Sequence, residues 1–477
     1  MTVLQKLLTA GLPAVGLMIA AWANPTPNVT PDERVDLVSI VFHYAGNREY
    51  GKIFIPEYAR AMEIQFADVK EHPVIGMARE FHDRYGVSYN AIANLALRLA
   101  STESMQLKAE TLDSLDPRWP RERLGEFLKQ LRDFARQSKF SEFYAAQAPL
   151  YRTQCEFWQN RLEQSQAASW AKRFYGETRP LHFTVIPSAL ENGGVGPALE
   201  MDGEFYCYMV SMVFNSEMRR KIEAEPGAAE SFEMRISSFL AHEFSHPWTN
   251  PVANAIYPQI QVTAEKIFPT LQEAMKRQSY GTPRTMMIEM LNRAAELVYL
   301  HDRYGKEKAE RHLAVQKANG FLLTERLFRC ILAEREKGGA SWRFSDGARA
   351  YIDCINADES LQLLHSLELA IKNAPSLVSI SPENGAKNVD PATTELVITF
   401  SKPMTGMAIC MADSGIPPQF ISAAYDDSRT VLTVEVQLKP DSEYRLWLNR
   451  NANKNFASSD GGVLPDTEYV FYTGPAR

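Results

Sequence analysis

The chain has 477 residues, of which 45% are hydrophobic and 23% are charged, an ordinary balance for a globular protein. This length is enough for two or three domains, each with a sizeable core. The formal net charge of -7 predicts no basic surface, which argues against nucleic acid as a partner.

The N-terminal residues have the pattern of a secretory signal peptide at positions 1–23. One basic residue, Lys6, precedes an apolar run from Leu7 to Ala21, and the small-x-small cleavage pattern A-W-A closes it. The alternative is a membrane anchor, but the run is short and contains Pro13 and two glycines. We therefore expect export to a periplasm, to the cell surface or to the medium, with no stable membrane span after cleavage.

The next part of the chain, about residues 35–175, carries mostly helical patterns. Apolar residues recur there at spacings of three and four, and prolines mark the breaks. The stretch 35–44 is β-branched and apolar, which fits either a first strand or the start of a buried helix. His72 and His82 could approach a site, although histidines on mixed helix faces are more often structural.

The pattern changes at residue 181. Residues 181–187 and 204–215 are strand-like, and the glycine-rich segment 192–197 between them predicts turns. A helix at about 228–246 follows, with large apolar residues at helical spacing. This is the arrangement that a zinc-peptidase site needs, because a strand at the sheet edge can receive an extended peptide. Which strand forms the edge is left open.

This helix carries the motif H-E-x-x-H, formed by His242, Glu243 and His246. Residues four apart lie on one face of an α-helix, so both imidazoles can bind one zinc ion, with Glu243 beside them as general base. The alternative is a solvated helix that carries two histidines by chance. We expect a Zn2+ site, because a chance match in a chain this long is on the order of one in a hundred.

A proline follows the second histidine directly. Pro247 lacks an N–H group and restricts the residue before it, so the helix is predicted to end or bend at His246. The pair Asn250-Pro251 is typical of a turn, which would send the chain toward the next helices.

Catalytic zinc commonly has three protein ligands, so a third is expected downstream. Helices are predicted at 263–277 and 283–304, and the second carries Glu289 and Glu296, seven residues apart on nearly the same face. Glu289 is the first choice and Glu296 the second, while each could also be a surface glutamate. The candidate donors to a tetrahedral oxyanion are Tyr257, Tyr280, Tyr299 and His301.

Residues 375–477 follow a composition break and carry short β patterns separated by turn clusters, as in a β-sandwich. The strands are predicted at 377–381, 395–400, 431–436, 444–448 and 468–472.

The five cysteines are too scattered to form a disulfide framework. Cys330 and Cys354 fall in neighbouring predicted helices and could pair, although isolated buried cysteines are the simpler interpretation.

Four segments resemble a bacterial family of exported proteins of unknown function that carries an H-E-F-S-H motif. They are V-D-L-V-S-I-V-F-H-Y at 35–44, K-E-H-P-V-I at 70–75, H-E-F-S-H-P-W-T-N-P at 242–251 and I-E-M-L-N-R-A at 288–294. That family resembles gluzincin-type zinc metallopeptidases, which implies a zincin-like domain over residues 24–374. The resemblance implies His242 and His246 as metal ligands, Glu243 as the base and Glu289 as the third ligand. Pro247 departs from the usual zincin helix, which continues after the second histidine.

Three further segments resemble a bacterial Ig-like domain of the surface-protein type. They are S-I-S-P-E-N-G-A-K-N-V-D at 379–390, I-T-F-S-K-P-M at 398–404 and L-K-P-D-S-E-Y at 438–444. The resemblance implies an accessory sandwich over residues 375–477, without chemistry of its own, that mediates contacts with a surface or with proteins.

These observations predict an α+β protein, with a mostly helical zincin-like domain that contains a small sheet and an all-β Ig-like sandwich after it. The predicted function is an exported zinc metallopeptidase that hydrolyses peptide or protein substrates through a zinc-bound water and Glu243. The alternatives are a non-catalytic periplasmic or cell-surface binding protein with this fold, and a metal-dependent amidase that acts on cell-wall material. An intact Glu243 favours the two enzymes, because a pure binding site does not need a base.

Overall fold

The computed structural model describes residues 27–108, 114–191, 193–214, 228–411, 415–450, 455–459 and 462–475. Contacts divide the chain into two units, one of Met1–Arg173 and Glu177–Phe244, the other of Phe174–Gly176 and Ser245–Arg477. The signal peptide predicted at 1–23 lies outside the described residues. In the described part of the chain, no helix is both long and apolar enough to cross a membrane.

Helix α1 (Glu33–Ala45) occupies the segment for which the sequence left a strand or a buried helix open. The Asp32 side chain caps its N-terminus by accepting from the Arg34 backbone N–H, and Gly46 ends it in the left-handed conformation. Most of its residues are buried, so the apolar run belongs to a helix enclosed by the core. The helices that follow are α2 (Pro56–Gln65), α3 (Pro73–Tyr85), α4 (Asn90–Ala96), α5 (Arg121–Gln137), α6 (Phe140–Ala146), α7 (Ala148–Ser165) and α8 (Ala167–Tyr175).

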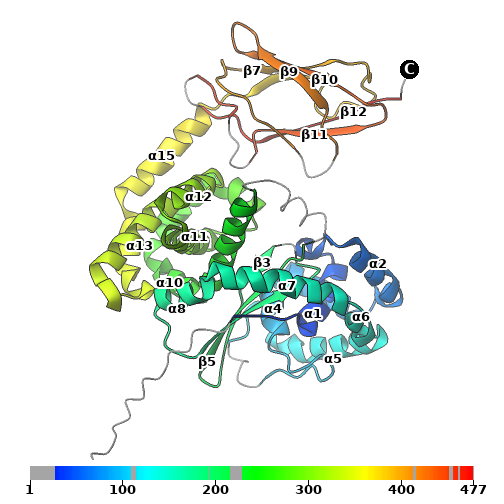
Figure 1. The fold of residues 1–477 in the computed structure, drawn as a ribbon, viewed down its shortest axis with the longest axis vertical. Coiled ribbons are helices and arrows are strands. Elements are labelled where there is room, and N and C mark those ends of the chain that lie inside the picture. The colour runs from blue at the N-terminus through cyan, green and yellow to red at the C-terminus, as the bar shows by residue number, and fades with distance from the viewer. Residues whose placement is uncertain are drawn as a thin grey trace, which may run out of the picture. The chain divides into compact units, whose positions relative to one another are not determined.

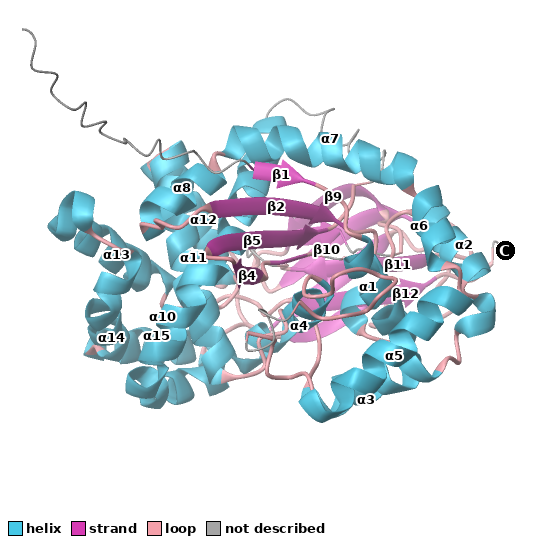
Figure 2. Cartoon of the chain, turned by 90° about the horizontal axis from the view of Figure 1, so that it is seen from below, coloured by secondary structure: helices cyan, strands magenta, loops and turns pink. Residues whose placement is uncertain are grey.

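The first unit also contains a small mixed sheet, whose strands lie side by side in Figure 2. Three strands run parallel: β1 (Pro27–Val29), β2 (Leu181–Pro187) and β5 (Glu204–Ser211). Two short strands pair antiparallel with β5 and form the edge beside it: β3 (Gly194–Val195) and β4 (Ala198–Met201). Both predicted strands are therefore present, and β3 forms inside the segment that the sequence predicted as turns. Helix α7 packs against β1 and β2.

Helix α10 (Ala228–Arg277) runs without a break through the H-E-x-x-H motif. The prediction that the helix ends near His246 is therefore wrong, as is the predicted turn at Asn250-Pro251, and the helix predicted at 263–277 is its C-terminal part. The reason lies in the spacing of its four prolines. They follow one another at intervals of four, seven and eleven residues, so they lie within about 40° of one another on one face: Pro247, Pro251, Pro258 and Pro269. The last three are exposed, so water can bond to the carbonyl groups that lose an N–H partner.

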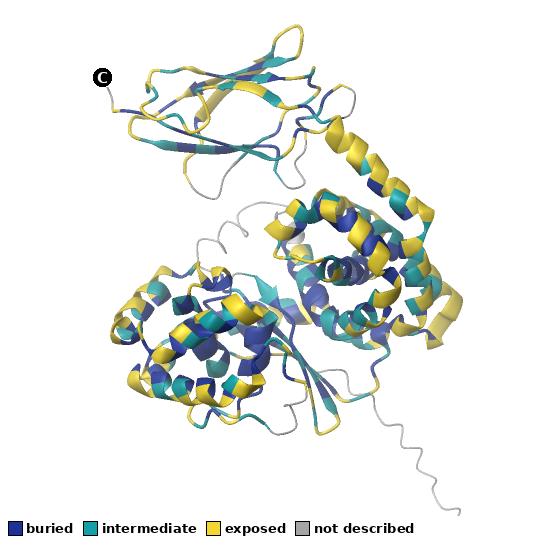
Figure 3. Ribbon diagram, turned by 180° about the vertical axis from the view of Figure 1, so that it is seen from behind, coloured by how far each residue is buried: buried dark blue, intermediate teal, exposed yellow. Residues whose placement is uncertain are grey.

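Helix α11 (Pro283–Tyr304) is buried along most of its length in the second unit, as Figure 3 shows. It begins as predicted, because the Thr282 hydroxyl accepts from the Thr285 backbone N–H and Pro283 takes the first helical position. Two helices pack against it (Figure 1), namely α12 (Lys306–Ala318) and α13 (Thr324–Gly338). Helices α14 (Ala348–Asn356) and α15 (Asp358–Lys372) follow.

The C-terminal region is a β-sandwich of two antiparallel sheets, ordered β6-β7-β10-β9 and β12-β11-β8. Its strands are β6 (Leu377–Ser381), β7 (Glu395–Phe400), β8 (Ile409–Met411), β9 (Gln419–Tyr425), β10 (Val431–Gln437), β11 (Glu443–Leu448) and β12 (Thr467–Tyr472). All five predicted strands are confirmed, and β8 and β9 were missed. Strand β8 has only three residues, and β9 is exposed along most of its length, so neither shows the alternation that marks a half-buried strand.

Candidate metal centre

The part of α10 that belongs to the first unit, which ends at Phe244, packs on the sheet of that unit. The Phe244 ring packs on Phe183 of β2, with ring centroids 4.6 Å apart. His242 is 8% exposed and Glu243 5% exposed, so neither is a solvated surface residue. Because α10 is continuous, His242 and His246 lie one turn apart on the same helix, as the spacing predicted.

Helix α11 supplies a carboxylate to this face. One ligand atom from each of His242, His246 and Glu289 lies within 4.8 Å of the other two. The Nε2 atom of His246 and Oε1 of Glu289 are 3.8 Å apart. Around a tetrahedral zinc ion, ligand atoms are separated by about 3.3 Å, so small side-chain movements bring all three to one ion. Two imidazoles and a carboxylate form a donor set that catalytic zinc sites use.

Glu296, the second choice, is engaged elsewhere. Its Oε1 atom lies 2.8 Å from Nε2 of His312, and the carboxylate is buried in that contact. Glu289 and Glu296 are separated by about 10 Å along the helix axis, so they cannot both reach the same ion. The geometry therefore brings Glu289, and not Glu296, to the two histidines.

Two asparagines position His246, and the sequence analysis missed this role for both. The Nδ1 atom of His246 lies 3.0 Å from Oδ1 of Asn250, one turn further along α10. The Nε2 atom lies 3.3 Å from Nδ2 of Asn292, and Asn292 is held in turn by a 2.7 Å hydrogen bond from the Thr249 hydroxyl. When Nδ1–H donates to Asn250, the Nε2 lone pair accepts from Nδ2–H of Asn292, and the same lone pair could bind a metal in place of that hydrogen bond. The signal was present, since Asn250 lies four residues after His246 and Asn292 three after Glu289.

A buried arginine balances the charge of Glu289. The Nε atom of Arg293 lies 3.8 Å from Oε2 of Glu289, and the same guanidinium donates to the Tyr280 hydroxyl and to Oε1 of Gln316. Burial disfavours the charged guanidinium, but Tyr280 and Glu289 outweigh that effect and raise the pKa of Arg293 above its ordinary value. The guanidinium thus offsets the negative charge of the buried carboxylate.

A glycine brings the edge of the sheet close to Glu243. A Cβ atom added at Gly196, between β3 and β4, would lie 2.3 Å from the backbone oxygen of Glu243 and 3.2 Å from its Oε2. Pro247 has no N–H to donate to that backbone oxygen, whereas other residues at this position would. Only glycine permits so close an approach, which gives a physical reason for the glycine-rich segment before the motif.

The four candidate oxyanion donors differ in whether their contacts link them to the residues of the candidate metal centre. Tyr280 is joined to Glu289 through Arg293. The other three have different surroundings, since Tyr299 is fully buried with its ring near Tyr304, Tyr257 lies beneath Arg284, and His301 contacts Asp302 and Phe328.

The two N-terminal histidines have local partners. His72 caps α3, accepting from the Val74 backbone N–H, and also contacts Asp133, while His82 contacts its neighbour Asp83. The cap gives buried His72 a structural role, in agreement with the simpler interpretation from the sequence, whereas the His82 side chain contacts its exposed neighbour.

Comparison with known proteins places this mixed helix-and-sheet chain in a family. Residues 29–341 match the family described as Domain of unknown function (DUF4932), and the chain belongs to that family. Residues 371–473 match the Bacterial Ig-like domain, in agreement with the sandwich. A comparison with curated proteins finds no match.

Two solved structures of surface-layer proteins are similar to the chain at low levels. Surface layer protein SbsC, domains 1–6, is 14% identical, with 53% of this chain and 38% of that chain covered and a TM-score of 0.17. The S-layer protein rSbsC(31-844) is also 14% identical, with 84% and 45% covered and the same TM-score of 0.17. The chain spans less than half the length of either protein, and such scores define no shared overall fold.

Proposed function

We propose that the protein is an exported zinc-dependent metallopeptidase with a zincin-like fold. The observation that carries the proposal is the convergence of His242, His246 and Glu289, three buried or half-buried donors from α10 and α11, within 4.8 Å. Buried histidines and glutamates are costly to hold together without a ligand to share, so their convergence favours a built site over chance. Export is supported by the signal-peptide pattern at 1–23 and by the bacterial Ig-like region.

Each residue near the site has a separate role in the proposed hydrolysis. Zinc in such a site supplies Lewis acidity, which activates water and polarises a scissile carbonyl. Glu243 accepts the proton of the attacking water and passes it to the leaving amine. Asn250 holds the His246 imidazole in the tautomer that presents Nε2, and Arg293 fixes Glu289.

The edge of the sheet provides a place for the substrate. Strands β3 and β4 pair only with β5 among the described strands, so their outer side can accept an extended peptide through backbone hydrogen bonds. Gly196 joins these two strands and lies against Glu243, so a peptide added along this edge would pass beside the base. The same arrangement supports the zincin-like interpretation of the fold, in which an edge strand runs next to the motif helix.

The test uses the mature chain that begins at Asn24, in wild-type and Glu243→Ala forms. Metal content is measured after zinc loading, and cleavage is followed with a broad peptide library. We expect about one zinc per chain in both proteins and cleavage by the wild type alone. Stoichiometric zinc without cleavage would refute the peptidase in favour of the binding protein, and failure to bind zinc would refute the site itself.

A further inference from the structure

Two cysteines of the second unit face each other across a pair of packed helices. Cys330 lies on α13 and Cys354 on α14, both partly exposed, and their side chains form a hydrogen bond. The backbone of Cys354 is fixed by two donors to its carbonyl oxygen, Nε of Arg326 at 3.4 Å and the Ser360 hydroxyl at 3.1 Å. The two sulfur atoms are therefore held near each other by the helices and do not depend on a mobile loop.

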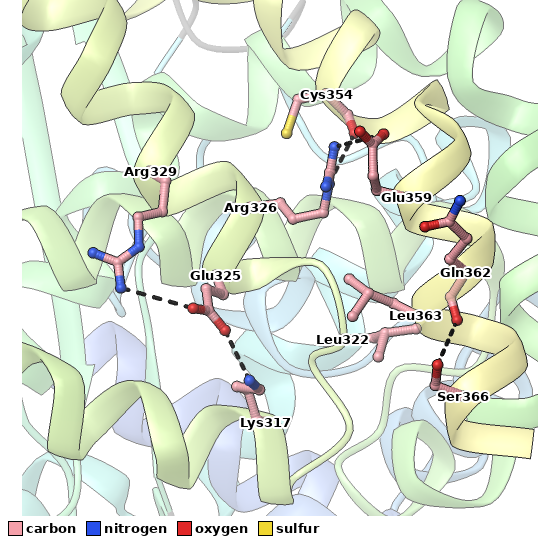
Figure 4. Close-up of a pocket in the computed structure, with 10 residues that line it drawn as sticks. All are labelled: Lys317, Leu322, Glu325, Arg326, Arg329, Cys354, Glu359, Gln362, Leu363 and Ser366. Atoms are coloured by element: carbon pink, nitrogen blue, oxygen red, sulfur yellow. Dashed lines mark hydrogen bonds and ion pairs between the residues drawn. The ribbon is translucent and has the colours of Figure 1, made fainter. Parts of the chain in front are cut away.

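Cys354 also lines a pocket, shown in Figure 4. The pocket has a volume of about 670 Å³ and is formed by residues of α12 to α15 and the segment before α13: Lys317, Leu322, Glu325, Arg326, Arg329, Cys354, Glu359, Gln362, Leu363 and Ser366. Among the described residues, Cys354 lines this pocket and Cys330 does not. A reagent that enters the pocket therefore meets Cys354 and not Cys330.

The shared hydrogen bond makes the two thiols unequal. It lowers the pKa of Cys354 to about 7, an effect that burial opposes and the Arg326 guanidinium reinforces. The same hydrogen bond raises the pKa of Cys330 well above its ordinary value. Cys330 therefore donates its S–H to the Cys354 sulfur, which is the better nucleophile of the two.

We propose that Cys330 and Cys354 form a redox-active dithiol that is converted to a disulfide by exchange with a small disulfide entering this pocket. The Cys354 thiolate attacks one sulfur of the oxidant, the oxidant's S–S bond breaks, and one thiolate leaves. Cys330 then gives up its proton and attacks the Cys354 sulfur, which releases the second thiolate and forms the Cys330–Cys354 bond. Two protein thiols are oxidised and one disulfide is reduced to two thiols, so electrons and atoms balance.

This inference does not depend on the proposed metallopeptidase, because it concerns helices α13 and α14 and involves no metal ligand. An exported protein meets disulfide-containing oxidants as it folds, and such compartments preserve disulfides. The cross-link would close the segment from Cys330 to Cys354, which restricts the unfolded chain and stabilises the folded one.

The test is disulfide mapping on the full mature chain after reduction and then incubation with oxidised glutathione at pH 8. Free thiols are alkylated, the protein is digested, and cross-linked and modified peptides are identified by mass spectrometry. We expect a Cys330–Cys354 cross-linked peptide and a melting temperature several degrees above that of the reduced protein. In Cys330→Ser, glutathione should accumulate on Cys354, whereas Cys354→Ser should leave Cys330 unmodified.

Cys155→Ser is the matched control, because Cys155 is also partly exposed but lies on α7, and this variant should form the cross-link normally. The proposal fails if both cysteines of the oxidised wild type remain open to alkylation, or if either is found bonded to another cysteine. It also fails if Cys330 and Cys354 acquire glutathione equally in the two single variants. Disulfide mapping of the wild-type protein does not depend on whether a variant folds, so it supports or refutes the Cys330–Cys354 disulfide by itself.

Discussion

Asp36 on α1 and Glu289 on α11 are both buried carboxylic acids, and they differ in the polar groups that surround them. Asp36 on α1 is surrounded by hydroxyl donors, namely Tyr58, Tyr151 and Ser188. Burial raises the pKa of Asp36 to about 7, although these hydrogen bonds oppose the shift. Glu289 on α11 is instead bordered by His246 and the Arg293 cation.

The two carboxylates differ in the kind of group that contacts them. The donors around Asp36 contact both of its oxygens within the core, so the group ties α1 to other elements. The neighbours of Glu289 are a potential metal ligand and a cation that offsets its charge. We therefore expect Asp36, among hydroxyl groups, to act as a structural link, and Glu289, whose carboxylate converges with two histidines, to act as a metal ligand. The following predictions test this contrast, from the largest expected effect to the smallest.

Substitution of a third buried acid, Glu243, should lower catalysis without changing zinc binding. Glu243→Gln is expected to lower kcat by about 10³-fold, because the amide cannot accept the proton of the attacking water. Zinc content should stay at the wild-type level. Peptide cleavage and metal analysis on the same preparation measure both effects, and unchanged cleavage would remove Glu243 from the mechanism.

Glu289→Gln should weaken zinc binding by more than about 100-fold, since a direct ligand contributes more than the groups that orient it. Glu296→Gln is the matched control, as it changes a buried acid on the same helix that contacts His312. Its zinc affinity should be unchanged. Competition with a chelator gives the affinities, and equal losses in the two variants would contradict the assignment of Glu289.

Asp36 should make the protein less stable as the pH rises. Because the folded-state pKa is raised from 3.8 to about 7, its stabilising contribution is complete below the unfolded value and is lost as the pH passes through about 7. Between pH 5 and pH 8 the loss should be about 3 kcal/mol. Urea unfolding at both pH values measures it. Asp36→Asn should remove this pH dependence and leave zinc binding intact, and a variant that keeps the full dependence would show that another group is responsible.

Asn250→Ala should reduce zinc affinity by about 10- to 100-fold without removing a ligand. The expected cause is loss of the partner that orients His246 through Nδ1. Asn254→Ala, one turn further along α10, removes a contact to Arg284 and serves as the control. Isothermal titration with zinc distinguishes them, and equal affinities would contradict a positioning role for Asn250.

Gly196→Ala should cost about 1–2 kcal/mol of stability and lower peptidase activity, because the new methyl group would overlap the Glu243 backbone oxygen. Gly193→Ala, where an added Cβ meets nothing within 4 Å, should be close to wild type. Thermal unfolding and cleavage assays compare the pair. An active and stable Gly196→Ala protein would show that the sheet edge can move away from the base.

Local signals in the sequence predicted much of this architecture. The start of α11 follows from Thr282 and Pro283, and five strands of the sandwich follow from alternation, because capping and periodicity act over a few residues. Local rules failed at Pro247. A proline was expected to end α10, but four prolines on one face allow the helix to continue where water can bond to its carbonyl groups.

The H-E-x-x-H spacing by itself determined that His242 and His246 share a helix face, because helical geometry needs no other part of the chain. Only the tertiary structure decided between Glu289 and Glu296, since two full turns separate them and the position of α11 against α10 selects the one that reaches the histidines. Tertiary packing likewise brought Asn292 of α11 to Nε2 of His246, whereas Asn250 is a partner within α10 itself, one turn away. The physical reason is that contacts between elements depend on how whole helices pack, which spacing within one helix does not encode.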